Sequence, residues 1–182
     1  MRLERLEATQ RPEKLKAVFD GEALTVSASL CVQFSLCAGM ELDEEAFSTL
    51  KAAMAKESAR ERAVRILTAS AVSERELEKR LVQKGTLPAD AADAVAWLKE
   101  HRFLDDAATA AQLVDSAVRK GYGRARVKNI LYEKGIPKDL WDEALARIPA
   151  MDDAIDRFLA AKLRGRTADE KTIKKTIDAL LR

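Results

Sequence analysis

A dense basic run is the part of this sequence best suited to bind a partner. Residues 119–128 hold five basic side chains and no acidic one, namely Arg119, Lys120, Arg124, Arg126 and Lys128. Gly121 and Gly123 lie within the run, where they allow the backbone to approach a partner closely. Positive charge at the start of a helix opposes the helix dipole, so the pattern indicates a partner that supplies negative charge. The alternative is a solvated turn between two helices.

Two further features extend this candidate binding surface. Tyr122 either stacks on a partner or packs at the edge of the core. A second basic run follows later in the chain, with the members Lys162, Arg164, Arg166, Lys171, Lys174 and Lys175. If both runs contact one polyanion, binding will depend strongly on salt, because each neutralised phosphate releases counterions. If they do not, they are solvated helix faces.

Residue types needed for catalysis or metal binding are scarce. The single histidine, His101, excludes a histidine-based metal cluster and a conventional Ser-His-Asp triad. Asp105 and Asp106 are adjacent, and are better placed to cap a helix than to perform acid–base chemistry. Cys31 and Cys37 lack the spacing of a metal site and are interpreted as buried, reduced thiols. The sequence therefore predicts neither an enzyme nor a bound cofactor or metal.

Composition and charge indicate a helical protein with long solvated faces. Of the 182 residues, 34% are charged and only 5% are aromatic, and glycine and proline are scarce. Residues 119–182 hold 16 basic and 10 acidic side chains, a balance that suits an acidic partner. No apolar run is long enough to span a bilayer, and the first residues do not form a signal peptide. We expect a cytoplasmic monomer without membrane contact.

Alternating apolar residues near the N-terminus predict a small antiparallel sheet. Residues 15–19 and 23–26 have strand period, and Asp20-Gly21 between them is a favoured hairpin turn. Leucines within residues 3–6 add an earlier strand. A helix is predicted after Asp43. Further helix starts are predicted by capping residues at Ser58, Ser73, Asp105 and Thr167 and by first-turn prolines at Pro88 and Pro137.

An internal repeat of 50 residues organises the rest of the chain. The pattern Leu77-x-x-x-Leu81-x-x-Lys84-Gly85 recurs as Val127-x-x-x-Leu131-x-x-Lys134-Gly135, and Ile177 and Leu181 begin a third copy. Each glycine suits the residue after a helix, where the chain turns through a left-handed conformation. The predicted helices are 59–69, 73–84 and 88–101 in repeat one, 106–119, 123–134 and 137–147 in repeat two, and 151–163 and 168–181 in repeat three.

The predicted fold is mainly α, with tandem three-helix repeats that form an elongated curved array behind a small N-terminal antiparallel sheet. The predicted divisions are a leader with a linking helix over 1–57, repeat one over 58–104, repeat two over 105–149 and a partial third repeat over 150–182.

Four motifs in this order resemble the RecX family of bacterial regulators. They are Ser73-x-x-Glu76-Leu77-x-x-x-Leu81-x-x-Lys84-Gly85, Phe103-Leu104-Asp105-Asp106, Lys120-Gly121-Tyr122-Gly123 and Leu131-x-x-Lys134-Gly135-Ile136. The N-terminal hairpin resembles the leader of some members. The sequence departs from the family pattern by ending at Arg182 without a final third-repeat helix, and by carrying Ala69-Ser70 where many members have a basic residue.

The resemblance implies a partner and a role. Members of the family bind the RecA recombinase, on its filament with DNA, and modulate its ATP hydrolysis, strand exchange and co-protease activity in DNA repair and the SOS response. Inhibition is the direction the resemblance favours. Direct binding of single- or double-stranded DNA is also implied.

The alternative from another class is a stand-alone helical DNA-binding protein. Pairs of helices joined at Lys-Gly superficially resemble helix-turn-helix units. The last helix of each repeat argues against this reading, because residues 89–100 and 139–143 are acidic and ill suited to the major groove.

Overall fold

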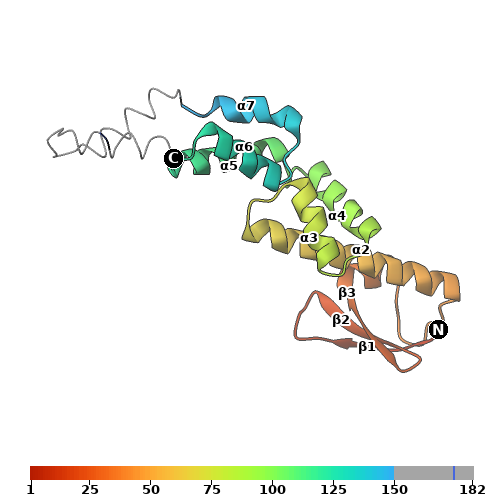
Figure 1. The fold of residues 1–182 in the computed structure, drawn as a ribbon. Coiled ribbons are helices and arrows are strands. Elements are labelled where there is room, and N and C mark those ends of the chain that lie inside the picture. The colour runs from red at the N-terminus through yellow and green to blue at the C-terminus, as the bar shows by residue number, and fades with distance from the viewer. Residues whose placement is uncertain (150–173, 175–182) are drawn as a thin grey trace. The chain divides into compact units, whose positions relative to one another are not determined.

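The computed structural model describes residues 1–149 and Lys174, and it is mainly helical (Figure 1). The chain divides into two compact units, Met1–Leu104 and Asp105–Arg182. The first unit contains β1 (Leu3–Ala8), β2 (Lys14–Phe19), β3 (Glu22–Ser27), α1 (Ala28–Gln33), α2 (Glu44–Ala69), α3 (Glu74–Gln83) and α4 (Pro88–Glu100). The second contains α5 (Asp106–Arg119), α6 (Arg124–Glu133), the 3₁₀ turn η1 (Lys138–Leu140) and α7 (Trp141–Ala146).

The predicted mainly helical class, with tandem three-helix repeats and an N-terminal antiparallel sheet, is confirmed. Apart from Lys174, the helices predicted for the third repeat lie outside the described residues, as do Thr167, Ile177 and Leu181. Within residues 1–149, no helix is long and apolar enough to cross a membrane.

The N-terminal sheet has the strand order β1-β2-β3, with both pairs antiparallel. Asp20 and Gly21 both have positive φ, 43° and 82°, as the tight turn between β2 and β3 requires. Phe19 pairs with Leu3 on one side and with Glu22 on the other. The predicted hairpin and the earlier strand are therefore both confirmed.

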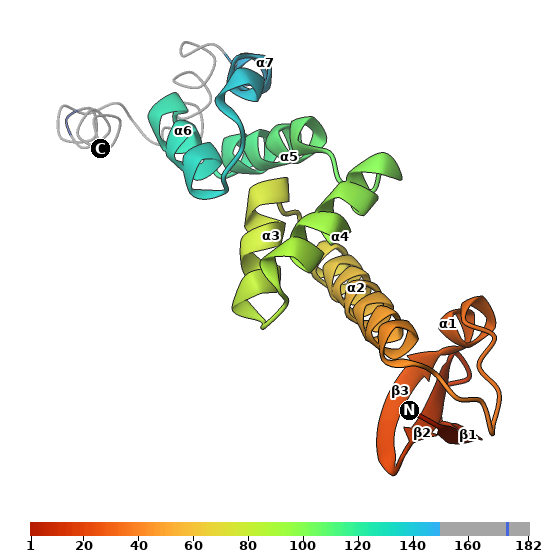
Figure 2. The same ribbon diagram turned by 90° about the vertical axis from the view of Figure 1, so that its right-hand side faces the viewer.

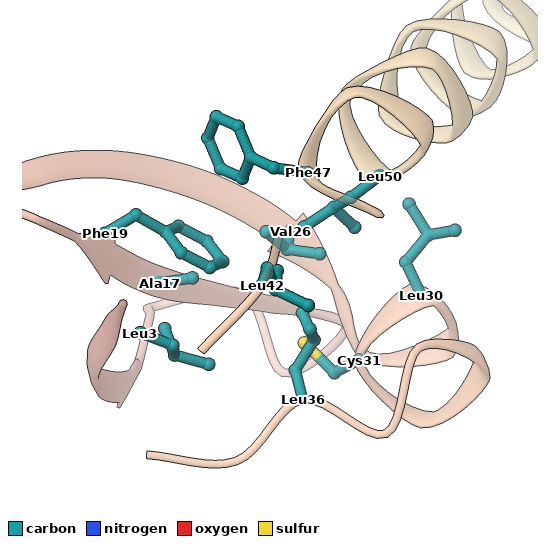
Figure 3. Close-up of a cluster of buried hydrophobic side chains, with 10 residues drawn as sticks. All are labelled: Leu3, Ala17, Phe19, Val26, Leu30, Cys31, Leu36, Leu42, Phe47 and Leu50. Carbon is teal, nitrogen blue, oxygen red and sulfur yellow. The ribbon is translucent and has the colours of Figure 1, made fainter. Parts of the chain in front are cut away.

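The sheet, α1 and the N-terminal half of α2 enclose the first hydrophobic core (Figure 3). Phe19 from β2 and Phe47 from α2 meet edge to face, with ring centroids 5.1 Å apart. The chain between α1 and α2 adds Leu36 and Leu42, both buried. These contacts fix the N-terminal half of α2 against the sheet.

Helix α2 is continuous from Glu44 to Ala69, so the predicted helix start at Ser58 is wrong. Residues 51–57 are alanine, lysine, methionine and glutamate, which are strong helix formers, and no residue there breaks the helix. The capping pattern at Ser58 therefore has no helix start to cap. The division expected between residues 57 and 58 falls inside this helix. Its N-terminal half packs in one hydrophobic core and its C-terminal half packs in another.

The C-terminal half of α2 packs with α3 and α4 in a second core (Figure 2). Ser73 begins α3 as predicted, and its hydroxyl accepts a hydrogen bond of 3.1 Å from the Glu76 amide. Leu77 and Leu81 of α3 are fully buried. Trp97 of α4 is only half-buried and packs at the margin of this core.

The second unit repeats this arrangement with α5, α6 and α7. Val127 and Leu131 are fully buried, as Leu77 and Leu81 are 50 residues earlier. Gly135 follows α6 with φ of 71°, just as Gly85 follows α3 with φ of 82°. The repeat predicted from the sequence is thus a structural repeat for these two helices.

The helix predicted over 137–147 is shorter than expected. Pro137 has an extended backbone, residues 138–140 form a 3₁₀ turn, and the α-helix begins only at Trp141. The indole of Trp141 donates a hydrogen bond of 3.0 Å to the Ile136 carbonyl and folds back over this turn. Pro137 therefore precedes the helical segment rather than occupying its first turn.

The two cysteines differ in exposure, so the prediction of two buried thiols is wrong for one of them. Both are free, but only Cys31 on α1 is buried, whereas Cys37 lies exposed in the loop after α1. Burial, aided by the charge of Glu57, raises the pKa of the Cys31 thiol.

We expect a thiol reagent at neutral pH to modify Cys37 quickly and Cys31 slowly, because the thiolate is the reactive form. A Cys37→Ser variant should lose the fast phase and keep the slow one. Time-resolved reaction with a chromogenic disulfide measures both phases. Equal rates for the two thiols would contradict the burial of Cys31.

Asp115 of α5 and Arg147 after α7 form a bidentate ion pair across the second unit, at 2.9 and 2.6 Å. The hydrogen bond from Arg147 holds the pKa of the Asp115 carboxyl below its ordinary value of 3.8. The stabilisation is therefore present above that value and is lost as the pH falls through the lowered pKa.

The Asp115→Asn variant should unfold at a slightly lower temperature than the wild type at neutral pH. The difference should shrink as the pH falls below 3.8, where the wild-type carboxyl also becomes neutral. Thermal unfolding followed by circular dichroism across this range measures it. A difference that persists at the lowest pH would show that the pair is not the cause.

Candidate functional site

The basic run predicted to bind a partner lies at the junction of α5 and α6. Helix α5 ends in a Schellman motif, in which the Gly121 amide donates to the Val118 carbonyl and the Tyr122 amide donates to the Ala117 carbonyl. Gly121 has φ of 76°, a conformation that side chains disfavour. Gly123 is the N-cap of α6. The two glycines thus make the turn that brings the basic residues together.

The basic residues of the run are solvent-exposed. Lys120 and Arg119 end α5, while Arg124, Arg126 and Lys128 occupy the first turns of α6. Val127 between them is fully buried and anchors the helix. Within residues 1–149, none of Lys120, Arg124, Arg126 and Lys128 forms an ion pair or a side-chain hydrogen bond. Their positive charge is left to solvent or to a partner.

Comparison with the first repeat shows what is unusual about the start of α6. The equivalent helix α3 begins with the capping hydroxyl of Ser73 and has Glu74 and Glu76 in its first turn. Helix α6 begins with Gly123, which has no capping side chain, followed by Arg124 and Arg126. Carboxylates stabilise the positive end of a helix and arginines do not. The second repeat therefore keeps a first turn that is unfavourable for the isolated helix.

Tyr122 also differs from its equivalent in the first repeat, in its exposure to solvent. Its equivalent in the first repeat, Val72, is fully buried, whereas Tyr122 is 41% exposed. The sequence left two interpretations of Tyr122 open, namely stacking on a partner and packing at the edge of the core. The exposure of the side chain is compatible with the first.

Sequence reasoning missed Tyr132, which is 71% exposed on α6. Residues four apart lie on one side of a helix, so Arg124, Lys128 and Tyr132 form one stripe. Two cations and an aromatic ring in line can bind phosphates and stack on a base. The spacing was available in the sequence, but the exposure of the tyrosine was not.

The remaining predicted contact residues, Lys162, Arg164 and Arg166, lie outside the described residues, as do Lys171 and Lys175. Lys174 is helical and exposed. Whether the second basic run joins the surface of α6 stays a prediction.

Asp105 and His101 each have a structural role in the fold. Asp105 caps α5, accepting hydrogen bonds of 2.8 and 3.1 Å from the amides of Ala107 and Ala108. His101 ends α4, where its Nδ1 lies 2.8 Å from the Trp97 carbonyl oxygen. In the described part of the chain, no group of three or more histidine, cysteine or carboxylate residues could hold a metal ion.

Family models match both helical repeats. Residues 59–98 match the first three-helix domain of RecX, and residues 105–145 match the second. These two repeats belong to the RecX family. The first repeat of the family model begins within α2, so the family domain and the N-terminal sheet share this helix.

Curated relatives with the name Regulatory protein RecX agree with this membership. The protein of Shigella dysenteriae is 38% identical over 95 residues, which are 47% of this chain and 57% of that protein. The protein of Cronobacter sakazakii is 36% identical over 96 residues, which are 47% of this chain and 58% of that protein. The matched part thus spans somewhat more than half the length of these relatives.

Two solved structures share the fold. A crystal structure of regulatory protein RecX is 22% identical, with a TM-score of 0.73, and covers 99% of this chain and 92% of the other. The crystal structure of RecX from Lactobacillus salivarius is 18% identical, with a TM-score of 0.57, and covers 71% of this chain and 87% of the other. At these identities the likeness concerns the fold. The chain therefore has the fold of these two RecX structures.

Proposed function

We propose that this protein binds the RecA recombinase on its filament with DNA and inhibits ATP hydrolysis, strand exchange and co-protease activity. It acts without catalysis of its own, as a monomer in the cytoplasm, in DNA repair and the SOS response. The membership of its two repeats in the RecX family supports the regulatory role. The single observation that carries the proposal is the uncapped, arginine-bearing start of α6 beside an exposed tyrosine.

The basic surface of the second repeat gives the proposal a physical basis. A filament with DNA presents phosphates and acidic side chains, and these can supply the negative charge that α6 lacks in its first turn. Docking there places the rest of the protein against the filament. The bound protein then opposes nucleotide turnover or the entry of a DNA partner by occupying space and by favouring one filament state.

The test is RecA ATP hydrolysis on single-stranded DNA, measured with increasing amounts of this protein. We expect the rate to fall and then to saturate as the filament becomes covered. Bovine albumin at the same concentrations controls for non-specific protein effects. An unchanged rate at every ratio of protein to RecA would remove the proposal.

Fluorescence anisotropy with labelled DNA, with and without RecA, separates this role from that of a stand-alone DNA-binding protein. The proposal expects weak, sequence-independent binding of free DNA and tighter binding to the filament. Tight sequence-specific binding in the absence of RecA would favour the alternative.

A further inference from the structure

A second basic surface lies in the first repeat, in a groove of about 520 Å³ between α2 and α3. Residues spaced three and four apart along α2 line one side, and Arg80 of α3 and its C-cap residue Lys84 line part of the other. The lining consists of Arg62, Arg65, Ile66, Ala69, Ser70, Arg80 and Lys84. Among the described residues that line it, four are basic and none is acidic.

Two of the guanidinium groups are held in place by the fold. Arg80 forms an ion pair of 2.5 Å with Glu76 and donates a hydrogen bond of 3.1 Å to the hydroxyl of Ser70. Arg62 donates a hydrogen bond of 3.2 Å to the carbonyl of Lys84, at the end of α3. These contacts orient part of the groove before any ligand arrives, which lowers the entropy cost of binding.

The other two cations have no such partner. Arg65 and Lys84 are exposed, and within residues 1–149 neither side chain forms an ion pair or a hydrogen bond. Ser70 accepts a hydrogen bond from Arg80, so its own hydroxyl proton remains available for donation. The groove therefore presents two unpaired charges and a hydroxyl donor beside two oriented guanidinium groups.

We propose that this groove binds the sugar–phosphate backbone of a nucleic acid strand. Contacts to phosphates come mainly from arginine, lysine and hydroxyl side chains, and interfaces with nucleic acid are more basic than those with protein. The groove has this composition, and the apolar residues in its described lining are Ile66 and Ala69. The proposal deepens the proposed function, because it gives the first repeat its own contact with the nucleic acid of a filament.

The test compares the salt dependence of strand binding in two variants that lose the same charge. Arg65→Gln with Lys84→Gln removes the two unpaired cations from the groove. Arg75→Gln with Lys79→Gln removes two exposed cations of α3 that do not line it. Fluorescence anisotropy of labelled oligothymidylate, without RecA, gives the affinity at several salt concentrations. Thermal unfolding confirms that both variants fold, and Lys84→Gln alone provides a milder change.

Removing two phosphate contacts should make the slope of log affinity against log salt shallower by about 1.4, since each contact on a single strand contributes about 0.7. Lys84→Gln alone should give half of this change, and the control variant should keep the wild-type slope. Equal slopes for the groove and control variants would overturn the proposal.

Failure of the wild-type protein to bind the strand would also overturn the proposal, as would displacement of the strand by polyglutamate as efficiently as by unlabelled oligothymidylate. The latter result would identify an acidic polypeptide as the ligand. Because RecA is absent from this assay, these outcomes are distinct from a failure to change RecA ATP hydrolysis.

Discussion

Reversal of two charges at the start of α6 should abolish the effect on RecA without destabilising the protein. In the variant Arg124→Glu with Arg126→Glu, glutamates replace the exposed arginines of the first helical turn. Acidic residues there interact favourably with the helix dipole, by about 0.3–1 kcal/mol each at an exposed site. We therefore expect an unfolding temperature equal to or above that of the wild type, together with loss of RecA inhibition.

The matched control reverses Arg75 and Lys79, which are exposed on the equivalent helix of the first repeat. This variant has the same net charge and should retain inhibition. ATP hydrolysis and thermal unfolding are measured on all three proteins. If the α6 variant unfolds at a much lower temperature, the two arginines support the fold and do not form a binding surface.

Truncation of Leu131 or Leu81 to alanine should cost about 2–5 kcal/mol of unfolding free energy. Each leucine is fully buried and belongs to the hydrophobic core formed by the three helices of its repeat. The cavity left by alanine cannot be filled without moving these helices. Urea unfolding followed by circular dichroism measures the loss.

The neighbouring Val82 serves as the control, because it is 41% exposed and its truncation should change the unfolding free energy by less than about 0.5 kcal/mol. Since the two leucines belong to different units, each variant should destabilise the transition of its own unit wherever two transitions are resolved. Similar small losses for Leu131, Leu81 and Val82 would contradict the assignment of the repeat cores.

Features set by local chemistry were predictable from the sequence. The turn at Asp20-Gly21 follows from the ease of positive φ, and the starts of α3 and α5 follow from the side chains of Ser73 and Asp105. The 50-residue repeat predicts which positions of α3 and α6 are buried, because both helices face their cores through equivalent positions.

Features that depend on packing or on competition between signals were not predictable. The capping pattern at Ser58 does not begin a helix, because the helix-forming residues before it continue α2 through that position. The exposure of Cys37 and Tyr132 depends on what covers a loop and a helix face. The groove of the first repeat joins arginines of α2 to basic residues of α3, and only the packing of these helices brings them together.

A cryo-electron microscopy map of the protein on a RecA filament assembled on single-stranded DNA tests the central claim most directly. We expect the first turns of α6, with Arg124 and Lys128, to lie against DNA phosphates or acidic RecA side chains. A map in which the protein is bound but α6 faces solvent would contradict it.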